Sequence, residues 1–180
     1  IDLVELFRGP ITSVTLHFNR GKVRLSEIQV FTEGAVPDHV QIWQPPLEDR
    51  TDILLLSTHG DDDQLFFAGL LPRYAGQEKV GVQVAYLTDH RNLTSERTHE
   101  ILNGLWATGC TVYPVMADFP DFRIDSLKGT YQEFERQGYD EDQLLGYVVE
   151  LLRRFNPQVV VGHDIDGEYG HGMHMVYTDC

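Results

Sequence analysis

The chain has 180 residues, of which 42% are apolar, and its 14 basic and 28 acidic side chains give a formal net charge of −14. This composition is typical of a soluble globular domain, because a chain of this length buries about 70% of its unfolded surface without disulfides or a structural metal. It excludes a disordered or fibrous protein. The longest apolar runs, such as 53–56 and 159–161, are far shorter than the roughly 20 residues that cross a bilayer.

The charge and the cysteines exclude further classes. An acidic surface repels phosphate, and no cluster of lysine and arginine overrides the negative charge, so nucleic acids and anionic membrane surfaces are poor candidate partners. Cys110 and Cys180 match no disulfide framework, zinc spacing or redox motif. We find no signal-peptide pattern within the sequence, so the compartment stays open at this point.

Residues 1–47 predict a β-rich segment. Apolar and polar side chains alternate at 13–18 and at 23–31, and turn-forming residues lie at 19–22. Since a lone hairpin is only marginally stable in water, we expect these strands to pack on another part of the protein. Prolines then interrupt the pattern, and we place a domain boundary near residue 48.

From residue 52 onward, short apolar strands alternate with amphipathic helices. The expected strands are 52–57, 79–88, 111–116 and 158–162, and the expected helices are 64–74, 94–108, 129–136 and 144–155. Residues 140–143 resemble a capping box before the last helix. This alternation predicts an α/β fold with a Rossmann-like, doubly wound and mostly parallel sheet in three layers.

Polar clusters follow the first and the fourth of these strands. Residues 58–63 leave the first strand, and residues 163–174 leave the fourth. In the common strand order 3-2-1-4 these strands are neighbours at the switch point, where open α/β sheets bind ligands beyond the carboxyl ends of their strands. We therefore expect both clusters to meet in one crevice.

Two pairs of side chains in these clusters are three residues apart: His59 with Asp62, and His171 with His174. This spacing can aim both members of a pair the same way. Two imidazoles and one carboxylate form an open three-ligand set that suits Zn²⁺ and leaves a position for water, whose pKa the ion lowers towards about 7. Asp61 can then take the proton of that water.

Each motif also has a simpler interpretation. Adjacent acidic residues at a helix start are usually caps, and glycine-rich loops with two histidines are often solvated turns. The metal-site hypothesis depends on their meeting at two neighbouring strand exits. By spacing alone, Arg97 and Glu100 are a helix-surface ion pair. Four other histidines are expected to have ordinary surface roles: His17, His39, His90 and His99.

Three motifs, in this order along the chain, resemble the PIG-L/LmbE-like family of zinc-dependent N-acetyl-sugar deacetylases: HGDDD at 59–63, RTHE at 97–100 and YGHGMH at 169–174. The similarity covers about residues 52–174. The resemblance implies that His59, Asp62 and His174 bind Zn²⁺.

The resemblance also implies roles for five other side chains. Asp61 would be the general base, and His171 would stabilise the oxyanion or protonate the leaving amine. Tyr169 would assist at the carbonyl oxygen, while Arg97 and Asp125 would contact the substrate. Together these roles imply a hydrolase that removes an N-acetyl group from an N-acetylglucosamine-type sugar or glycoconjugate.

The first motif departs from the family pattern His-Pro-Asp-Asp-Glu at Gly60 and Asp63, neither of which is a ligand position. Metal binding should survive, while Gly60 loosens the loop that holds Asp61. Another metal-dependent amidase or esterase, or a non-catalytic glycan-binding descendant of the fold, therefore remains an alternative.

Two further expectations follow from family resemblance. Residues 23–31 are similar to the closing strands of a discoidin-type carbohydrate-binding β-sandwich, which implies a glycan-directed, multidomain parent protein. We expect an extracellular or cell-surface location rather than a cytoplasmic one. The deacetylase family implies further sheet and helix elements after the position of His174, so we expect residues 48–180 to be a deacetylase domain that is truncated at its C-terminus.

Overall fold

The structure is a computed structural model that describes residues 11–17, 28–31, 34–88 and 95–180, with the backbone alone described at Ser95, Asp118 and Tyr169. Two compact units, Ile1–Trp43 and Gln44–Cys180, are described separately. Among the described residues, no helix is both long and apolar enough to cross a membrane.

In the first unit, the described parts of the expected strands are irregular. Residues 11–17 and 28–31 contain no strand, and the apolar side chains of Val14 and Ile28 are more than half exposed. The strands predicted at 13–18 and 23–31 are therefore wrong for these parts, because an alternating pattern makes a stable strand only when another layer buries its apolar face. The predicted turn at 19–22 lies outside the described residues, and the discoidin resemblance stays a prediction.

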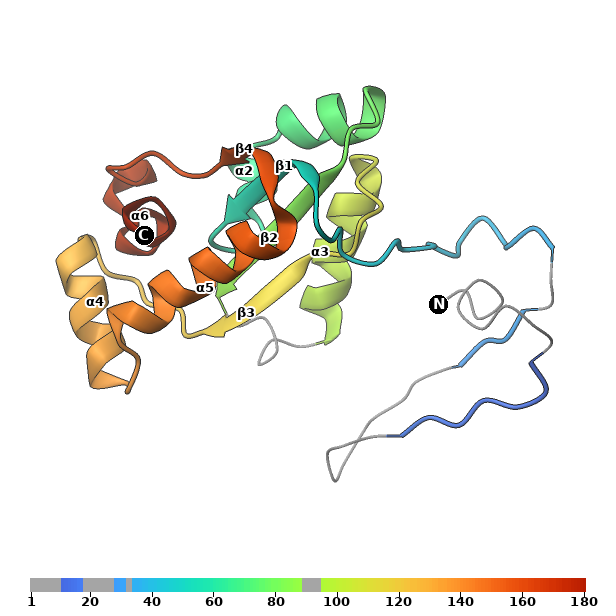
Figure 1. The fold of residues 1–180 in the computed structure, drawn as a ribbon, viewed down its shortest axis with the longest axis horizontal. Coiled ribbons are helices and arrows are strands. Elements are labelled where there is room, and N and C mark those ends of the chain that lie inside the picture. Colours follow the sequence, from blue (N-terminus) through green and yellow to red (C-terminus); the bar gives the residue numbers. More distant parts are fainter. Residues whose placement is uncertain (1–10, 18–27, 32–33, 89–94) are drawn as a thin grey trace. The chain divides into compact units, whose positions relative to one another are not determined.

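The second unit contains a four-stranded sheet, which Figure 1 shows with helices packed around it. Its strands are β1 (Thr51–Ser57), β2 (Val82–Thr88), β3 (Val115–Phe119) and β4 (Pro157–Val161). All pairs are parallel and the order is β3-β2-β1-β4. This arrangement confirms the predicted α/β fold with a mostly parallel sheet.

The central strand β1 pairs with β2 on one side and with β4 on the other, and its apolar side chains are buried on both faces of the sheet. Leu55, for example, lies opposite Val84 of β2 and Val161 of β4. A strand covered on both faces requires an unbroken apolar run rather than an alternating one, and the sequence from Ile53 to Leu56 provides it.

Helices cover both faces of this sheet. They are α2 (Asp62–Leu65), α3 (Ser95–Ala107), α4 (Leu127–Arg136), α5 (Glu141–Phe155) and α6 (Gly172–Asp179). Helices α4, α5 and α6 pack on the face that carries Leu54 and Leu56, where Phe134 and Phe155 are almost fully buried. Since side chains alternate along a strand, Ile53 and Leu55 point to the opposite face. A π-helical turn (Pro72–Gln77) and a 3-10 turn (Glu168–Gly170) complete the elements.

The predicted elements differ from the structure in several places. The strand predicted at 79–88 begins at Val82, helix α6 was not predicted, and two further elements differ. The helix expected at 64–74 is broken into α2 and the π-helical turn, because Phe66 and Phe67 turn their rings towards His163 and Pro72 begins a new helical segment. The third strand begins at Val115 rather than at residue 111, since Val112 instead makes an isolated bridge with Gln44.

Candidate active site

Three segments meet at the carboxyl end of the sheet. The exit of β1 is tied to α6 by the hydroxyl of Thr58, which donates to the carbonyl of Met173 over 3.4 Å. The loop before α4 is tied to the start of α6, because the backbone N–H of Gly172 donates to the carbonyl of Ile124 over 2.7 Å. The two polar clusters expected to share a crevice therefore lie together.

Three side-chain atoms from these segments converge. Nδ1 of His59 lies 3.1 Å from Oδ2 of Asp62, and Nε2 of His174 lies 3.3 Å from that nitrogen and 3.4 Å from that oxygen. Asp62 and His174 are buried, while His59 is partly open. These are the three residues that the family resemblance assigned to the metal.

The spacing of these atoms fits a metal ion. A tetrahedral Zn²⁺ ion with bonds of about 2.0–2.1 Å holds its ligand atoms about 3.3 Å apart, close to the three observed distances. Two ring nitrogens and a carboxylate oxygen are also the donor types that Zn²⁺ binds. The donor set therefore could hold a divalent cation.

Without a metal, the electrostatics of this cluster favour a protonated His59 beside an ionised Asp62, so an ion would have to displace a proton from His59. Burial opposes protonation of His59, but its hydrogen bonds with Asp121 and Asp62 outweigh burial and raise its pKa to about 9. Burial likewise opposes ionisation of Asp62, yet its contacts with His163, His174 and His59 hold its pKa well below the usual range. The cluster thus preserves the anionic oxygen that a cation requires.

A second group of side chains adjoins the first. His163, which has a fully buried ring, stacks on His174 with centroids 4.2 Å apart and planes at 7°. Its Nδ1 is hydrogen-bonded to Oε2 of Glu168, and that oxygen lies 3.4 Å from Nδ1 of His174. Donor atoms of His163, Glu168 and His174 lie close enough together to hold an ion as well.

Asp61 and Arg97 form an ion pair beside the cluster. Nη2 of Arg97 lies 3.3 Å from Oδ2 of Asp61, and its Nη1 lies 3.2 Å from Oε2 of Glu100. The expected Arg97–Glu100 pair is thus present, but Arg97 also joins the first and second motifs. Asp61 is half exposed whereas its neighbour Asp62 is buried, so consecutive carboxylates occupy different environments.

His171 lies over the cluster, with its ring stacked on His174 at a centroid distance of 4.7 Å. Its Nδ1 accepts the backbone N–H of Met173 over 3.3 Å, so the neutral ring carries its proton on Nε2. Burial and the adjacent His174 lower the pKa of His171, which favours this neutral form. The backbone of Tyr169 lies in the 3-10 turn, and its side chain is outside the described part of the structure.

The loop that contains Asp125 reaches the site through a different residue. Asp125 is exposed, whereas Asp121 in the same loop accepts from Nε2 of His59 over 3.0 Å. None of the three motifs includes Asp121, which lies 62 residues from His59 along the chain, so the sequence did not indicate this contact. His163 and Glu168 were also missed, although both lie within the polar segment after β4.

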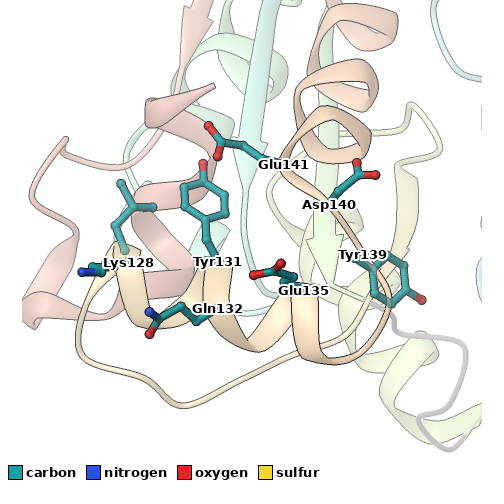
Figure 2. Close-up of a pocket in the computed structure, with 8 residues that line it drawn as sticks. Lys128, Tyr131, Gln132, Glu135, Tyr139, Asp140 and Glu141 are labelled. Carbon is teal, nitrogen blue, oxygen red and sulfur yellow. The ribbon is translucent and has the colours of Figure 1, made fainter.

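A groove of about 600 Å³ lies elsewhere, between α4 and the start of α5 (Figure 2). The labelled side chains come from α4, such as Lys128, Tyr131 and Glu135, and from residues 139–141, such as Glu141. None of the candidate site residues lines this groove. The chemistry of the histidine cluster, rather than cavity volume, therefore identifies the candidate site.

The sequence of the chain is similar to a known family and to curated proteins. The family model described as PIG-L, GlcNAc-PI de-N-acetylase, matches residues 54–179. A relative from Streptomyces avermitilis named 1D-myo-inositol 2-acetamido-2-deoxy-alpha-D-glucopyranoside deacetylase is 27% identical over 149 residues, which are 72% of this chain and 50% of the relative.

Proteins with the same name from Rhodococcus jostii and Mycobacterium bovis are similar to a comparable extent. The relative from Rhodococcus jostii is 27% identical, with 68% of this chain and 49% of the relative covered. The relative from Mycobacterium bovis is 28% identical, with 68% and 47% covered. The chain spans about half the length of the curated relatives it matches. Because the family model matches well over half of the chain, and its range contains all three motifs, the chain belongs to the PIG-L family.

Proposed function

We propose that this protein is a zinc-dependent deacetylase that removes the N-acetyl group from an N-acetylglucosamine-type sugar. The observation that carries this proposal is the convergence of His59, Asp62 and His174 within 3.4 Å of one another, next to Asp61 and His171. Membership of a family of deacetylases supports it.

The three converging side chains would hold the ion. When bound, Zn²⁺ polarises an amide carbonyl and makes water more acidic. Asp62 would supply a negative charge and the two rings would supply neutral nitrogens. Because these are only three ligands, one coordination position of the ion would stay open for chemistry. The partly open side chain of His59 leaves this side of the cluster accessible.

Asp61 would act as the general base. It follows the ligand position His59 by two residues, is not one of the converging atoms, and keeps a carboxylate half exposed at the site. Its pairing with Arg97 restricts the direction of that carboxylate. Asp61 would accept a proton from water while the water oxygen forms a bond to the acetyl carbon.

His171 would stabilise the oxyanion. With its proton on Nε2, the neutral ring can donate a hydrogen bond to the developing oxyanion. The proton that Asp61 accepts from water would pass to the sugar nitrogen as the C–N bond breaks, which releases acetate and an amine. We further propose that Tyr169 assists at the carbonyl oxygen. Arg97 and Asp125 would contact the polar groups of the sugar.

The relatives guide the choice of substrate. Their printed name describes deacetylation of an acetamido-glucopyranoside of inositol. We therefore propose an acetylated glucosamine in glycosidic linkage as the substrate class, with an inositol glycoside as the first compound to test.

Acetate release from such glycosides by protein loaded with one equivalent of Zn²⁺ tests the proposal. Substitution Asp61→Asn should lower kcat/KM by about 10²- to 10⁴-fold, the usual contribution of a general base, while zinc is still retained. Asp166→Asn is the matched control, since it removes one negative charge from an exposed residue of the loop after β4.

Several outcomes would contradict the proposal. Equal turnover by wild type and Asp61→Asn would remove Asp61 from the mechanism. Cleavage of non-sugar amides or esters alone would indicate another metal-dependent hydrolase. Sugar binding in calorimetry without turnover, by protein that retains no stoichiometric metal, would indicate a glycan-binding module.

A further inference from the structure

We propose that Glu168 and His163 are positioning residues. They contact the two buried ligands, His174 and Asp62, and fix the orientation of these side chains. This inference rests on the proposed metal site. It concerns side chains that are outside the three ligand positions and belong to none of the catalytic roles above. Glu168 and His163 lie in the segment that joins β4 to α6, upstream of both His171 and His174.

The first step of the argument is the protonation of His174. Its Nε2 belongs to the converging set, so a metal there leaves the proton on Nδ1. That nitrogen is buried and has no aligned hydrogen-bond partner, and Oε2 of Glu168 lies 3.4 Å from it. A metal-binding histidine usually donates its second N–H to a carboxylate, which fixes the tautomer and the ring orientation.

The second step is the link from Glu168 to Asp62. His163 is hydrogen-bonded to Glu168 through Nδ1, and its Nε2 lies 3.2 Å from Oδ2 of Asp62, close but not aligned as a hydrogen bond. The side chain of His163 is fully buried, and the rings of Phe66 and Phe67 lie against it. The ring of His163 therefore links the position of Glu168 to the position of Oδ2 of Asp62, which is the negatively charged ligand atom.

The third step concerns the stacked rings. His163 and His174 lie nearly parallel, 4.2 Å apart, and both direct Nδ1 to the same oxygen of Glu168. Phe66 packs edge-on against both rings. The pair is thus held by the stacking of its rings, by Phe66 and by one carboxylate, so a change at Glu168 should alter His174 directly and Asp62 through His163.

The same atoms suggest a competing assignment, in which His163, Glu168 and His174 bind a second ion. A neutral imidazole has one lone-pair nitrogen, so His174 cannot serve both sets in that form. An ion at the second set would also have to replace the hydrogen bond between His163 and Glu168. We therefore assign this group to positioning, and the number of bound ions distinguishes the two assignments.

Zinc affinity, measured by competition with a chelator, tests the inference in the absence of substrate. Glu168→Gln keeps the size of the side chain but removes the charge, and it should weaken zinc binding by about 10- to 100-fold. His163→Gln should weaken it to a similar extent. Asp166→Asn also removes one negative charge, at an exposed position three residues after His163, and it should leave the zinc affinity unchanged.

Visible absorption of the Co²⁺-substituted protein provides a readout that a purely structural role would not change. Glu168→Gln should alter the ligand-field bands, because the rings and the carboxylate no longer hold the same angles. Thermal unfolding of the metal-free variants checks that they fold. If Glu168→Gln does not fold, His163→Gln and Glu168→Asp are measured in its place.

Three results would overturn the inference. Wild-type zinc affinity and an unchanged Co²⁺ spectrum in both variants would show that the ligands need no such support. Two bound ions in wild type and one in Glu168→Gln would make Glu168 a ligand. Absence of zinc binding in wild type would remove the metal site itself, whereas zinc binding without deacetylation would contradict only the proposed function.

Discussion

His59 contacts two carboxylates, through Nδ1 to Asp62 and through Nε2 to Asp121. Burial disfavours its cation, but the two carboxylates outweigh burial and raise the pKa of His59 to about 9. A pKa raised on folding stabilises the folded state below the unfolded value of 6.5, and this stabilisation is lost as the pH rises through about 9. The melting temperature of the metal-free protein should therefore fall over this interval.

Asp121→Asn tests this cause. The variant should lose only roughly 1 kcal/mol of stability at pH 6, because Asp121 is mostly exposed and solvent screens its ion pair. The pH at which half of the fall in melting temperature has occurred should also be lower than in the wild type. The exposed Asp125 of the same loop gives the control Asp125→Asn, which should follow the wild-type profile. An unchanged midpoint in Asp121→Asn, read from thermal unfolding at several pH values, would exclude this ion pair as the cause.

At the scale of secondary-structure elements, Gly172 sets how closely α6 approaches its neighbours. A Cβ there would lie 2.3 Å from Oγ1 of Thr130 and 2.5 Å from the carbonyl oxygen of Ser126. Gly172→Ala should therefore displace the start of α6, cost roughly 1–3 kcal/mol and weaken zinc binding through His174. Urea unfolding and chelator competition measure the two effects.

Gly146 provides a matched control, because it lies within α5 and a Cβ there meets nothing within 4 Å. Gly146→Ala should leave zinc affinity unchanged and stabilise the protein by up to about 1 kcal/mol. Equal stability and equal zinc affinity in the two alanine variants would contradict the close approach at Gly172.

Elements whose signals are local could be predicted from the sequence. The capping box before α5 is one example, since Asp140 accepts the backbone N–H of Gln143 and the side chain of Gln143 accepts that of Asp140. The sequence marks an interruption at Pro72, where the π-helical turn begins. The earlier end of α2 at Leu65 could not be predicted, because Phe66 and Phe67 contact the distant ring of His163.

The same distinction applies to the candidate site. The pairs His59 with Asp62 and His171 with His174 follow from short spacing, and the strand order brings them together. Asp121 joins them only through a loop whose course no local pattern specifies. Glu168 lies close to the third motif, but its contact with His174 depends on the 3-10 turn between them.

At the scale of the whole molecule, β4 is one of the two edge strands of the described sheet, and it carries exposed valines. Among the described residues it pairs with β1 alone, and Val159 and Val160 are 51% and 46% exposed although they point to opposite faces. Unpaired backbone groups beside exposed valines favour association between sheets. Val160→Lys should therefore reduce concentration-dependent self-association, as measured by sedimentation velocity.

The expected change in stability for Val160→Lys is within about 0.5 kcal/mol, because the side chain is already half exposed. Leu145→Lys on α5 is the control, since Leu145 is 41% exposed but lies on a helix without a strand edge. Equal self-association in wild type and Val160→Lys, or an equal decrease in both variants, would exclude the β4 edge as the contact.

The separation of His59 and His174 by 115 residues has a consequence for folding. These two side chains meet only after β1 has paired with β4 and α6 has docked, so ion capture would be among the last events as the chain folds. An ion held by both then acts as a reversible cross-link that closes a very long loop, and its entropic benefit grows with the logarithm of that length. Removal of the ion would open this cross-link and lower the stability of the folded chain, although no covalent bond is broken.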